Sequence, residues 1–484
     1  MTEAFEVVII GAGFSGIGMA LRLQQRGMHD FVMLEQADRC GGTWRDNQYP
    51  GAACDVESHL YSFSHSPNPE WSREFATQPE ILAYLEGLVE RHGLGRHLRL
   101  GQRVTRCAWD EAGARWTVHT AAGLVVTGKV LVAGYGPLNR PQPPEVPGLE
   151  RFEGALFHTA RWRHDVPLEG RSVGVVGTGA SAIQVVPAIA PIVGRLQVFQ
   201  RTAPWIVPKL DGEVSARRKQ WYRRVPALQR LRRLRIYWMR ELFATGMVLE
   251  PRAMELLGRL ALRNLRARVR DPALRARMTP DYTMGCKRIL PTNDYLPAFR
   301  RSNVELVTEP ITEVTARGVR TRDGVERPLD VLVLATGFEA SEAAVPFELL
   351  GRDGRELNAV WASGAEAYLG SAVAGFPNFF LVVGPNTGLG HGSMVFMIEA
   401  QVEYIVNALR AMRARRLRVV ELRPEALEAY NTALQRRLAG TVWETGCRSW
   451  YRTRSGKNTT LWPGFTFEFW RKTRRFDLPS YTAR

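Results

Sequence analysis

Short apolar runs lead directly into glycine-rich turns at two places in the chain. Residues 7–10 precede the turn at 11–16, and residues 173–176 precede the turn at 177–182. Beyond each turn the apolar positions recur at helical spacing, so each segment is predicted to be a buried parallel strand, a tight turn and a helix. Further apolar runs predict more buried strands at 31–34, 130–133, 196–199, 304–307, 330–338 and 379–383, and a helix is predicted near 394–413. This pattern is typical of an α/β fold with two Rossmann-like domains.

Apolar residues follow a different pattern between residues 214 and 279, where they recur every three or four positions with arginines between them. This spacing predicts a helical insertion. We expect its apolar stripe to pack against the neighbouring nucleotide domain, and a helix lying on a membrane surface is the alternative. The stripe consists of Trp221, Val225, Leu228, Leu231, Leu234, Trp238 and Leu242.

The two glycine turns predict two dinucleotide sites. Glycines at a strand-to-helix junction let the backbone approach a pyrophosphate, and the helix presents its positive N-terminal end to it. One such turn alone is weak evidence, but two in one chain indicate two dinucleotides placed for electron transfer. The candidate residues are Gly11, Gly13, Phe14, Ser15 and Gly16 in the first turn, and Gly177, Thr178, Gly179, Ala180 and Ser181 in the second.

The residues that end the second strand of each unit indicate which dinucleotides bind. Glu35, followed by Gln36, ends the run at 31–34, where a carboxylate can accept both ribose hydroxyls of FAD or NAD. The run at 196–199 leads instead to Arg201 and Thr202. A guanidinium at this position suits a 2′-phosphate and therefore NADP, although a solvated surface arginine is the alternative.

Composition excludes few classes of protein. The chain has 484 residues, a formal net charge of +17 and 45% hydrophobic residues. The basic residues are scattered and no nucleic-acid motif accompanies them, so we expect no nucleic-acid partner. No apolar stretch approaches the roughly 18 residues of a membrane span. The N-terminus has no signal-peptide pattern, and a cytoplasmic enzyme is predicted.

Five widely spaced cysteines contain no close pair. The sequence therefore argues against a disulfide framework, a metal site or a dithiol redox centre. Unpaired thiols suit a reducing compartment. The positions are Cys40, Cys54, Cys107, Cys286 and Cys447.

Between the two turns lies an ordered motif of the form FxGxxxHxxxW, made by Phe152, Gly154, His158 and Trp162. This motif resembles the signature of type I Baeyer–Villiger monooxygenases, within the flavin-containing monooxygenase family, although Arg163 stands where that family usually has Pro or Asp. Other segments also resemble the family, and the likeness runs over nearly the whole chain. They are Gly41-Gly42-Thr43-Trp44, Tyr49-Pro50-Gly51, Asp55, and Gly285-Cys286-Lys287-Arg288.

The resemblance implies a reaction. In this family NADPH reduces FAD, and reduced flavin combines with molecular oxygen to give a C4a-peroxyflavin. That species attacks a small-molecule ketone to give an ester or lactone. The near alternative is a flavin-containing monooxygenase that oxygenates N or S centres of amines or thioethers. Two further alternatives are a pyridine nucleotide–disulfide reductase, which needs a reactive cysteine pair, and a basic binding module without cofactors.

The resemblance also implies roles for individual residues. Arg288 would stabilise the developing anion, because a guanidinium stays charged, and Asp55 would orient it. A structural ion pair between domains is the alternative. Lys287 would join Arg201 at the 2′-phosphate unless it is an ordinary surface lysine. His158 is expected to fix the linker conformation, and Trp44 and Trp162 fit packing as well as cofactor contact. Further implied cofactor contacts are Gly42, Thr43, Trp44, Tyr49, Asp55, Val104, Ala335, Thr336, Gly337 and Asn386.

Together these observations predict a domain organisation. Prolines between 137 and 147 indicate a linker, because proline breaks regular structure. The predicted parts are an FAD domain at 1–140 completed by 329–484, a linker at 141–168 that carries the FxGxxxHxxxW motif, an NADP domain at 169–213 and 280–328, and the insertion at 214–279.

Overall fold

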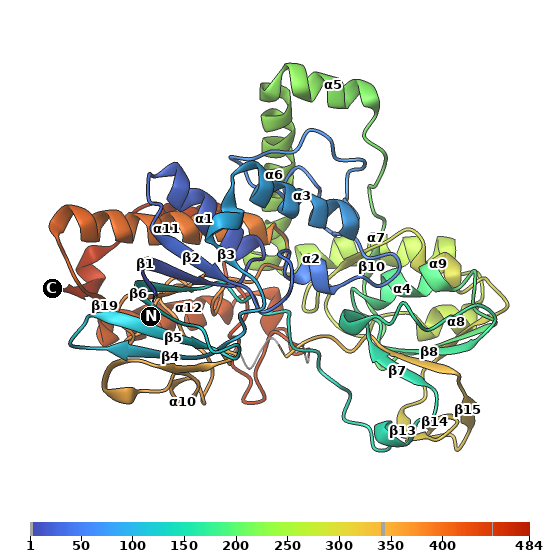
Figure 1. Ribbon diagram of the computed structural model, residues 1–484. Coiled ribbons are helices and arrows are strands. Elements are labelled where there is room, and N and C mark those ends of the chain that lie inside the picture. Colours follow the sequence, from blue (N-terminus) through green and yellow to red (C-terminus); the bar gives the residue numbers. More distant parts are fainter. Residues whose placement is uncertain (1–2, 340–343, 448) are drawn as a thin grey trace.

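The computed structural model describes residues 3–339, 344–447 and 449–484 and contains two sheet-based domains (Figure 1). The first domain is built on a mixed sheet in the order β17-β4-β5-β6-β1-β2-β3, with β18 also paired to β6. At its centre, β1 pairs in parallel with β2 and β6. The strands are β1 (Glu3–Ile10), β2 (Phe31–Leu34), β3 (Leu98–Arg99), β4 (Val104–Asp110), β5 (Arg115–Thr120), β6 (Val125–Ala133), β17 (Glu348–Leu350) and β18 (Phe379–Leu381).

Strand β1 is buried on both faces, which explains its continuous apolar run. Val7 and Ile9 belong to one hydrophobic cluster, whereas Val8 and Ile10 belong to another. Successive side chains of a strand point to opposite faces, so the two clusters are two packed layers. The first layer is formed largely by α1 (Phe14–Gln25), α3 (Gln78–Arg91) and α11 (Met394–Arg415).

The second domain contains five parallel strands in the order β12-β9-β8-β16-β7. Helix α4 follows β8 through the second glycine turn. Both sheets have the parallel strand–turn–helix arrangement, which confirms the predicted α/β fold class. The elements are β7 (Ala155–His158), β8 (Ser172–Val176), α4 (Ala182–Ile189), β9 (Arg195–Phe199), α9 (Tyr295–Ala298), β12 (Val304–Val307) and β16 (Val331–Leu334).

Two strands lie in a different domain from the one predicted. The sequence placed residues 155–158 in the linker and residues 331–334 in the returning part of the first domain. Backbone hydrogen bonds instead pair β16 with both β7 and β8 in the second sheet. The register aligns Val333 with Phe157 and Val175, so three buried side chains meet across neighbouring strands.

The remaining elements surround these two sheets. A small antiparallel sheet is attached to the second domain, and several helices cover the first. Other helices and strands of the chain are α2 (Thr43–Asp46), β10 (Ile206–Val207), α7 (Ala253–Arg268), α8 (Pro272–Arg277), β11 (Leu290–Pro291), β13 (Ile311–Thr315), β14 (Gly318–Thr321), β15 (Glu326–Pro328), α10 (Leu357–Val360), α12 (Pro424–Leu438), β19 (Val420–Leu422), α13 (Thr466–Thr473) and β20 (Tyr481–Ala483).

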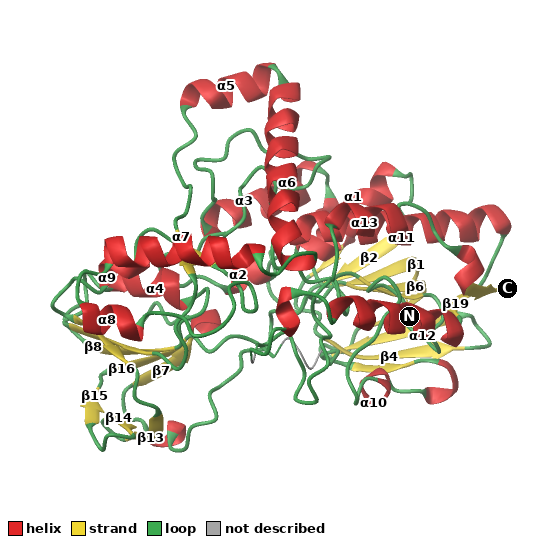
Figure 2. Cartoon of the chain, turned by 180° about the vertical axis from the view of Figure 1, so that it is seen from behind, coloured by secondary structure: helices red, strands yellow, loops and turns green. Residues whose placement is uncertain are grey.

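The insertion forms a projection that stands away from both sheets (Figures 1 and 2). Of the predicted insertion at 214–279, the projecting part is α5 (Ala216–Arg224) and α6 (Pro226–Val248), whereas Leu265 of α7 packs in the core of the second domain. Pro226 is the first residue of α6, where its missing N–H is harmless. The expected packing of its apolar stripe is wrong. All seven stripe residues, from Trp221 to Leu242, are exposed. A different face of α6 is buried: Ile236 packs in the core of the first domain, and the Arg233 guanidinium donates to the carbonyls of His59 and Ser62.

Among the described residues, the structure contains no helix with the length and apolarity that a membrane span requires.

Candidate active site

The first glycine turn is closed by tight backbone contacts. A Cβ on Gly16 would lie 1.9 Å from the carbonyl oxygen of Gly11, and Gly11 itself has a φ of +96°. Gly13 faces Gly42, where a Cβ would lie 3.0 Å from the Gly13 Cα. The two loops therefore approach each other with backbone alone. This cradle fits a pyrophosphate that must come close to main-chain N–H groups at the start of α1.

Glu35 is held in place at the end of β2. Its carboxylate accepts hydrogen bonds from the Ala12 N–H at 2.9 Å, the Ala37 N–H at 3.0 Å and the Arg45 Nη1 at 2.8 Å. The side chain is buried, whereas the neighbouring Gln36 is exposed. An ionised carboxylate fixed beside the turn is the group that an adenosine ribose requires.

The second glycine turn is more open. Gly177 has a φ of +115°, and a Cβ there would lie 2.5 Å from the Ala335 carbonyl oxygen. A Cβ on Gly179, by contrast, would meet nothing within 4 Å, and Ala180 is also exposed. The Thr178 hydroxyl donates to the Thr202 carbonyl at 2.9 Å, which joins the turn to the segment after β9. Ser181 immediately precedes α4.

Two cations lie near this open turn. Arg201 is exposed, and the Lys287 ammonium lies 4.7 Å from the centre of the Tyr282 ring. Burial, and then the positive charge of Arg201, lower the pKa of Lys287 below its usual value. Arg201 thus disfavours the charge of Lys287, and an anion bound between the two side chains would relieve this repulsion. A 2′-phosphate fits this arrangement.

Arg288 and Asp55 form a two-pronged ion pair across 233 residues of sequence. The Arg288 Nε donates to one carboxylate oxygen at 2.7 Å, and its Nη2 donates to the other at 2.7 Å. Both side chains are partly buried, at 31% and 22% exposure. The planar fork of arginine fixes the orientation of both groups, so the guanidinium has one defined position.

The charges of this pair support each other. The Asp55 carboxylate raises the pKa of Arg288, against the opposing effect of burial. Burial opposes ionisation of Asp55, but Arg288 holds the pKa of that carboxyl below its usual range. Arg240 of α6 also donates from Nη2 to the Asp55 carbonyl at 3.2 Å. The site therefore keeps a permanent positive charge with a fixed counter-ion.

The segment from Tyr49 to Asp55 rests directly on the second domain. The Tyr49 hydroxyl donates to Gln184 Oε1 at 2.9 Å, and Gln184 Nε2 donates to the Ala53 carbonyl at 2.9 Å. A Cβ on Gly51 would lie 2.7 Å from the Gln184 carbonyl oxygen. Gln184 lies on α4, two residues after its start. Gln184 is not predictable from the sequence, because a single glutamine on a helix belongs to no recognisable pattern.

The FxGxxxHxxxW motif is part of the second sheet. A Cβ on Gly154 would lie within 3 Å of the Phe152 ring, which packs over it. His158 ends β7, accepts the Ala160 N–H at Nδ1 and lies 5.7 Å from the Phe338 ring. Burial lowers the pKa of His158, and the Trp162 ring contacts Phe157. These contacts join the linker to the sheet, in keeping with the expected conformational role of His158.

The other predicted contact residues have varied environments. The Trp44 indole N–H donates to the Tyr61 hydroxyl at 3.1 Å, beside Gly42 and Thr43. Val104 is buried at the start of β4. The side-chain amide of Asn386 donates hydrogen bonds to the carbonyls of residues 458 and 461. Ala335, Thr336 and Gly337 follow β16, where the Thr336 hydroxyl donates to the Gln142 carbonyl.

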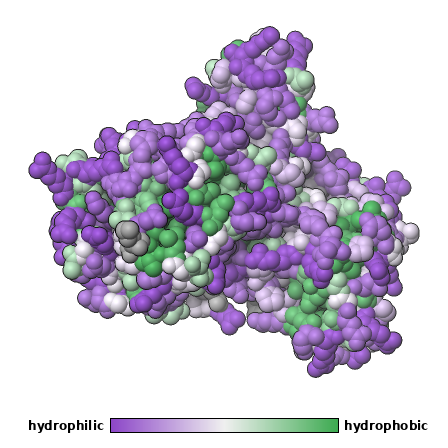
Figure 3. All heavy atoms as spheres, viewed as in Figure 1, coloured by the Kyte–Doolittle hydropathy of each residue, from purple (hydrophilic) through white to green (hydrophobic). Residues whose placement is uncertain are grey.

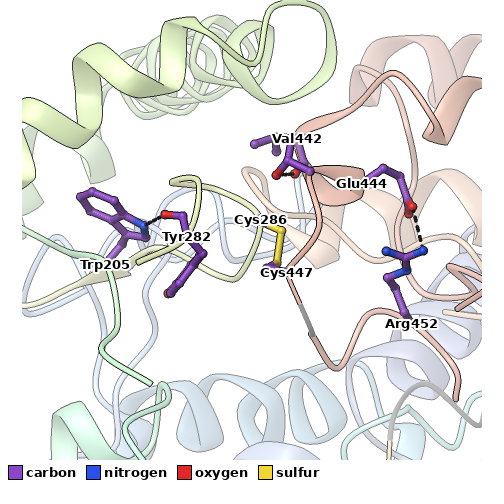
Figure 4. The surroundings of a disulfide bond; sticks show 8 residues. Trp205, Tyr282, Cys286, Val442, Glu444, Cys447 and Arg452 are labelled. Atoms are coloured by element: carbon purple, nitrogen blue, oxygen red, sulfur yellow. Dashed lines mark hydrogen bonds and ion pairs between the residues drawn. A yellow bond between two sulfur atoms is a disulfide. The ribbon is translucent and has the colours of Figure 1, made fainter. Parts of the chain in front are cut away.

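A disulfide joins Cys286 to Cys447, two residues from Arg288 (Figure 4). The expectation that all cysteines stay unpaired is therefore wrong for these two. Their sequence separation of 161 residues hides the pairing in the sequence. They meet because Met284 and Trp443 pack in one hydrophobic cluster. Cys40, Cys54 and Cys107 are free and buried.

Tyr451 lies close to the same ion pair. Its side chain is buried, and within the described ranges its hydroxyl has no hydrogen-bond partner. Burial raises its pKa to about 12, and Arg288 acts in the opposite direction. A neutral phenol beside a fixed guanidinium can donate a hydrogen bond to a bound oxygen atom.

Comparisons with known proteins agree with this geometry. The family model described as pyridine nucleotide-disulphide oxidoreductase matches residues 8–230, which include both glycine turns. A Baeyer–Villiger monooxygenase of Pseudomonas aeruginosa is 48% identical, over 98% of this chain and 91% of its own length. A solved structure of oxidized steroid monooxygenase bound to NADP is 34% identical, with a TM-score of 0.86 over 98% and 97% of the two chains. A solved structure of OTEMO in complex with FAD and NADP is 26% identical to this chain, with a TM-score of 0.89 over 100% of both chains.

Proposed function

This chain belongs to the Baeyer–Villiger monooxygenase family, and on that premise we propose that it inserts one oxygen atom of O2 beside the carbonyl of a small-molecule ketone. The product is an ester or a lactone. FAD and NADPH are the cofactors, as the solved relatives with these ligands support.

The first glycine turn holds FAD in this proposal. Gly13 and Gly42 let the pyrophosphate approach the backbone, and Glu35 accepts the ribose hydroxyls. The second turn holds NADPH, with Arg201 and Lys287 at the 2′-phosphate. When bound, FAD supplies the activation of oxygen and NADPH supplies the reducing equivalents.

The Arg288–Asp55 pair is the observation that carries the proposal. Attack on a ketone places negative charge on oxygen, and a fixed cation in a site that excludes water stabilises that charge. Arg288 is such a cation, because two hydrogen bonds to Asp55 fix its orientation and its charge persists at any pH of interest. In this proposal the buried Tyr451 hydroxyl, which has no hydrogen-bond partner among the described residues, donates a hydrogen bond to the ketone oxygen. Oxygenation of amines or thioethers needs no such cation.

Substitution of Arg288 tests this function. In Arg288→Ala we expect ester formation to fall at least a hundredfold, which corresponds to roughly 3 kcal/mol of transition-state stabilisation. Purified FAD-loaded enzyme is incubated with NADPH and a panel of cyclic and linear ketones, and esters are quantified by gas chromatography.

Arg352→Ala is the matched control. Arg352 also forms a two-pronged pair, with Glu421, at similar exposure but outside the site. We expect this variant to keep its ester yield. Sulfoxide from a thioether without ester from any ketone, by wild-type enzyme, would contradict the proposal in favour of N or S oxygenation.

A further inference from the structure

Helix α6 carries an apolar stripe on its exposed side, in addition to the apolar residues that it buries. Leu231, Leu234, Trp238 and Leu242 recur every three or four residues and are 51–75% exposed. They form one stripe along the helix, since residues at this spacing share a face. A surface helix of a globular protein normally turns such a stripe to the core.

The inward face of α6 combines apolar and polar contacts. Ile236 and Met247 are buried in two hydrophobic clusters. Gln229 donates to the Asn68 carbonyl at 2.7 Å, and Arg240 donates to the Glu57 carboxylate at 2.9 Å. Glu241 is buried and accepts both the N–H and the hydroxyl of Thr466, at the start of α13. These contacts fix the rotation of the helix. The outward direction of the leucines is therefore built into the fold.

Exposed arginines flank the stripe. At 100° per residue, Arg230 and Arg235 lie on opposite sides of the line through the leucines, and both are exposed. Arg217, Arg223 and Arg224 of α5 are also exposed. Between residues 214 and 249 the one acidic residue is Glu241, which is buried. Helices α5 and α6 thus present an apolar and basic outer surface, on which Arg223 forms an ion pair with the exposed Glu70 of the neighbouring loop.

The same surface continues onto α13. The Trp238 ring lies 6.2 Å from Phe467, which is itself exposed, as is Trp470 one turn further on. Arg471 and Lys472 follow and are exposed. On the face drawn in Figure 3 the projection is largely hydrophilic, and the larger hydrophobic areas lie on the two domains below it.

We propose that this surface, which we call the α6 face, binds the headgroup region of an anionic lipid bilayer. Leucine and tryptophan side chains enter the interface between headgroups and acyl chains, while the flanking arginines meet lipid phosphates. A second copy of the chain suits the surface less well. A twofold contact would set the arginines of one copy against those of the other. The inference is independent of the proposed function.

Vesicle co-sedimentation tests the proposal. FAD-loaded full-length enzyme is mixed with vesicles of pure phosphatidylcholine, or of phosphatidylcholine with phosphatidylglycerol, at low and high salt. We expect binding to the anionic vesicles that weakens as salt rises. The double variant Leu231→Gln/Leu242→Gln should bind the anionic vesicles about tenfold more weakly than wild type. The double variant Arg230→Glu/Arg235→Glu should lose about the same factor in vesicle binding.

Arg322→Glu/Val325→Gln is the control for both variants. These residues are exposed on the turn between β14 and β15, away from the α6 face (Figure 1). The control should bind vesicles like wild type, and all variants should retain NADPH-dependent turnover in solution. Absence of binding to anionic vesicles overturns the proposal. A concentration-dependent dimer, seen by light scattering, also overturns the proposal if the Leu231→Gln/Leu242→Gln variant no longer forms it. In that case the α6 face joins two copies of the chain.

Discussion

The two glycine turns follow the same local plan but differ in how completely they are enclosed. In the first, Gly16 touches the backbone of Gly11, Gly13 faces Gly42, and Glu35 is buried behind them. In the second, Gly177 is similarly tight, but Gly179 borders open space and Arg201 is exposed. One turn is therefore enclosed by protein, and the other is accessible from solvent.

This difference matches two kinds of ligand. A cofactor that remains bound through many turnovers benefits from an enclosed, preorganised site. A reductant that must bind and leave in each cycle needs an open one. The comparison indicates that the first turn is also a structural element of its domain, whereas the second serves binding with little effect on folding.

Alanine at one glycine of each turn, Gly16 in the first and Gly179 in the second, gives the strongest test of the comparison. Gly16→Ala places a Cβ 1.9 Å from a carbonyl oxygen, and we expect a loss of roughly 3 kcal/mol in unfolding free energy together with loss of bound flavin. Gly179→Ala meets nothing within 4 Å, and its stability should change by less than about 0.5 kcal/mol.

Thermal unfolding and the flavin absorbance of the purified proteins measure both effects of these alanines. The Gly179→Ala variant should still show a raised KM for NADPH, because its methyl group stands where the pyrophosphate approaches. Equal destabilisation by the two substitutions would refute the distinction between an enclosed and an open turn.

Removal of the cations at the open turn should produce a smaller effect, on coenzyme binding alone. Arg201→Ala and Lys287→Ala each lose a charged contact to the 2′-phosphate, and the KM for NADPH should rise about 10- to 100-fold. The KM for NADH should stay unchanged, since NADH lacks that phosphate. Arg195→Ala removes a surface arginine paired with Glu305 and serves as the control. Steady-state NADPH and NADH oxidation provides the comparison.

The pH dependence of coenzyme binding should show the smallest effect. Burial and Arg201 lower the pKa of Lys287, so this ammonium loses its proton earlier than an ordinary lysine as pH rises. Bound phosphate favours the charged form, and the KM for NADPH should therefore rise by up to about tenfold as pH passes through that lowered pKa. In Lys287→Arg the rise should disappear. An unchanged profile in this variant would assign the pH dependence to another group.

The sequence predicted those features that depend on local pattern. Both glycine turns, and the strands that precede them, follow from short apolar runs beside glycines whose backbone must approach other backbone. Arg288 and Asp55 were paired through the family resemblance, and the structure brings them together. Residue identities in short, ordered motifs were enough to predict this pair, without knowledge of the fold.

The features that the sequence did not predict depend on distant contacts. The periodicity of α6 defines a stripe but not the side it faces, and buried carbonyls that accept Arg233 decide that side. Strand β16 pairs with β7 and β8 through register, which no local pattern encodes. The Cys286–Cys447 disulfide depends on the packing of two segments 161 residues apart.

The hydrogen bonds of Gln184 have a consequence for recombining this enzyme with its relatives. Gln184 belongs to the second domain, yet it holds Tyr49 and Ala53, which precede Asp55 in the first. A chimera that exchanges the second domain alone would separate these partners and leave the Asp55 segment on a foreign helix. Crossover points should therefore be chosen so that residues 49–55 and α4 come from the same parent.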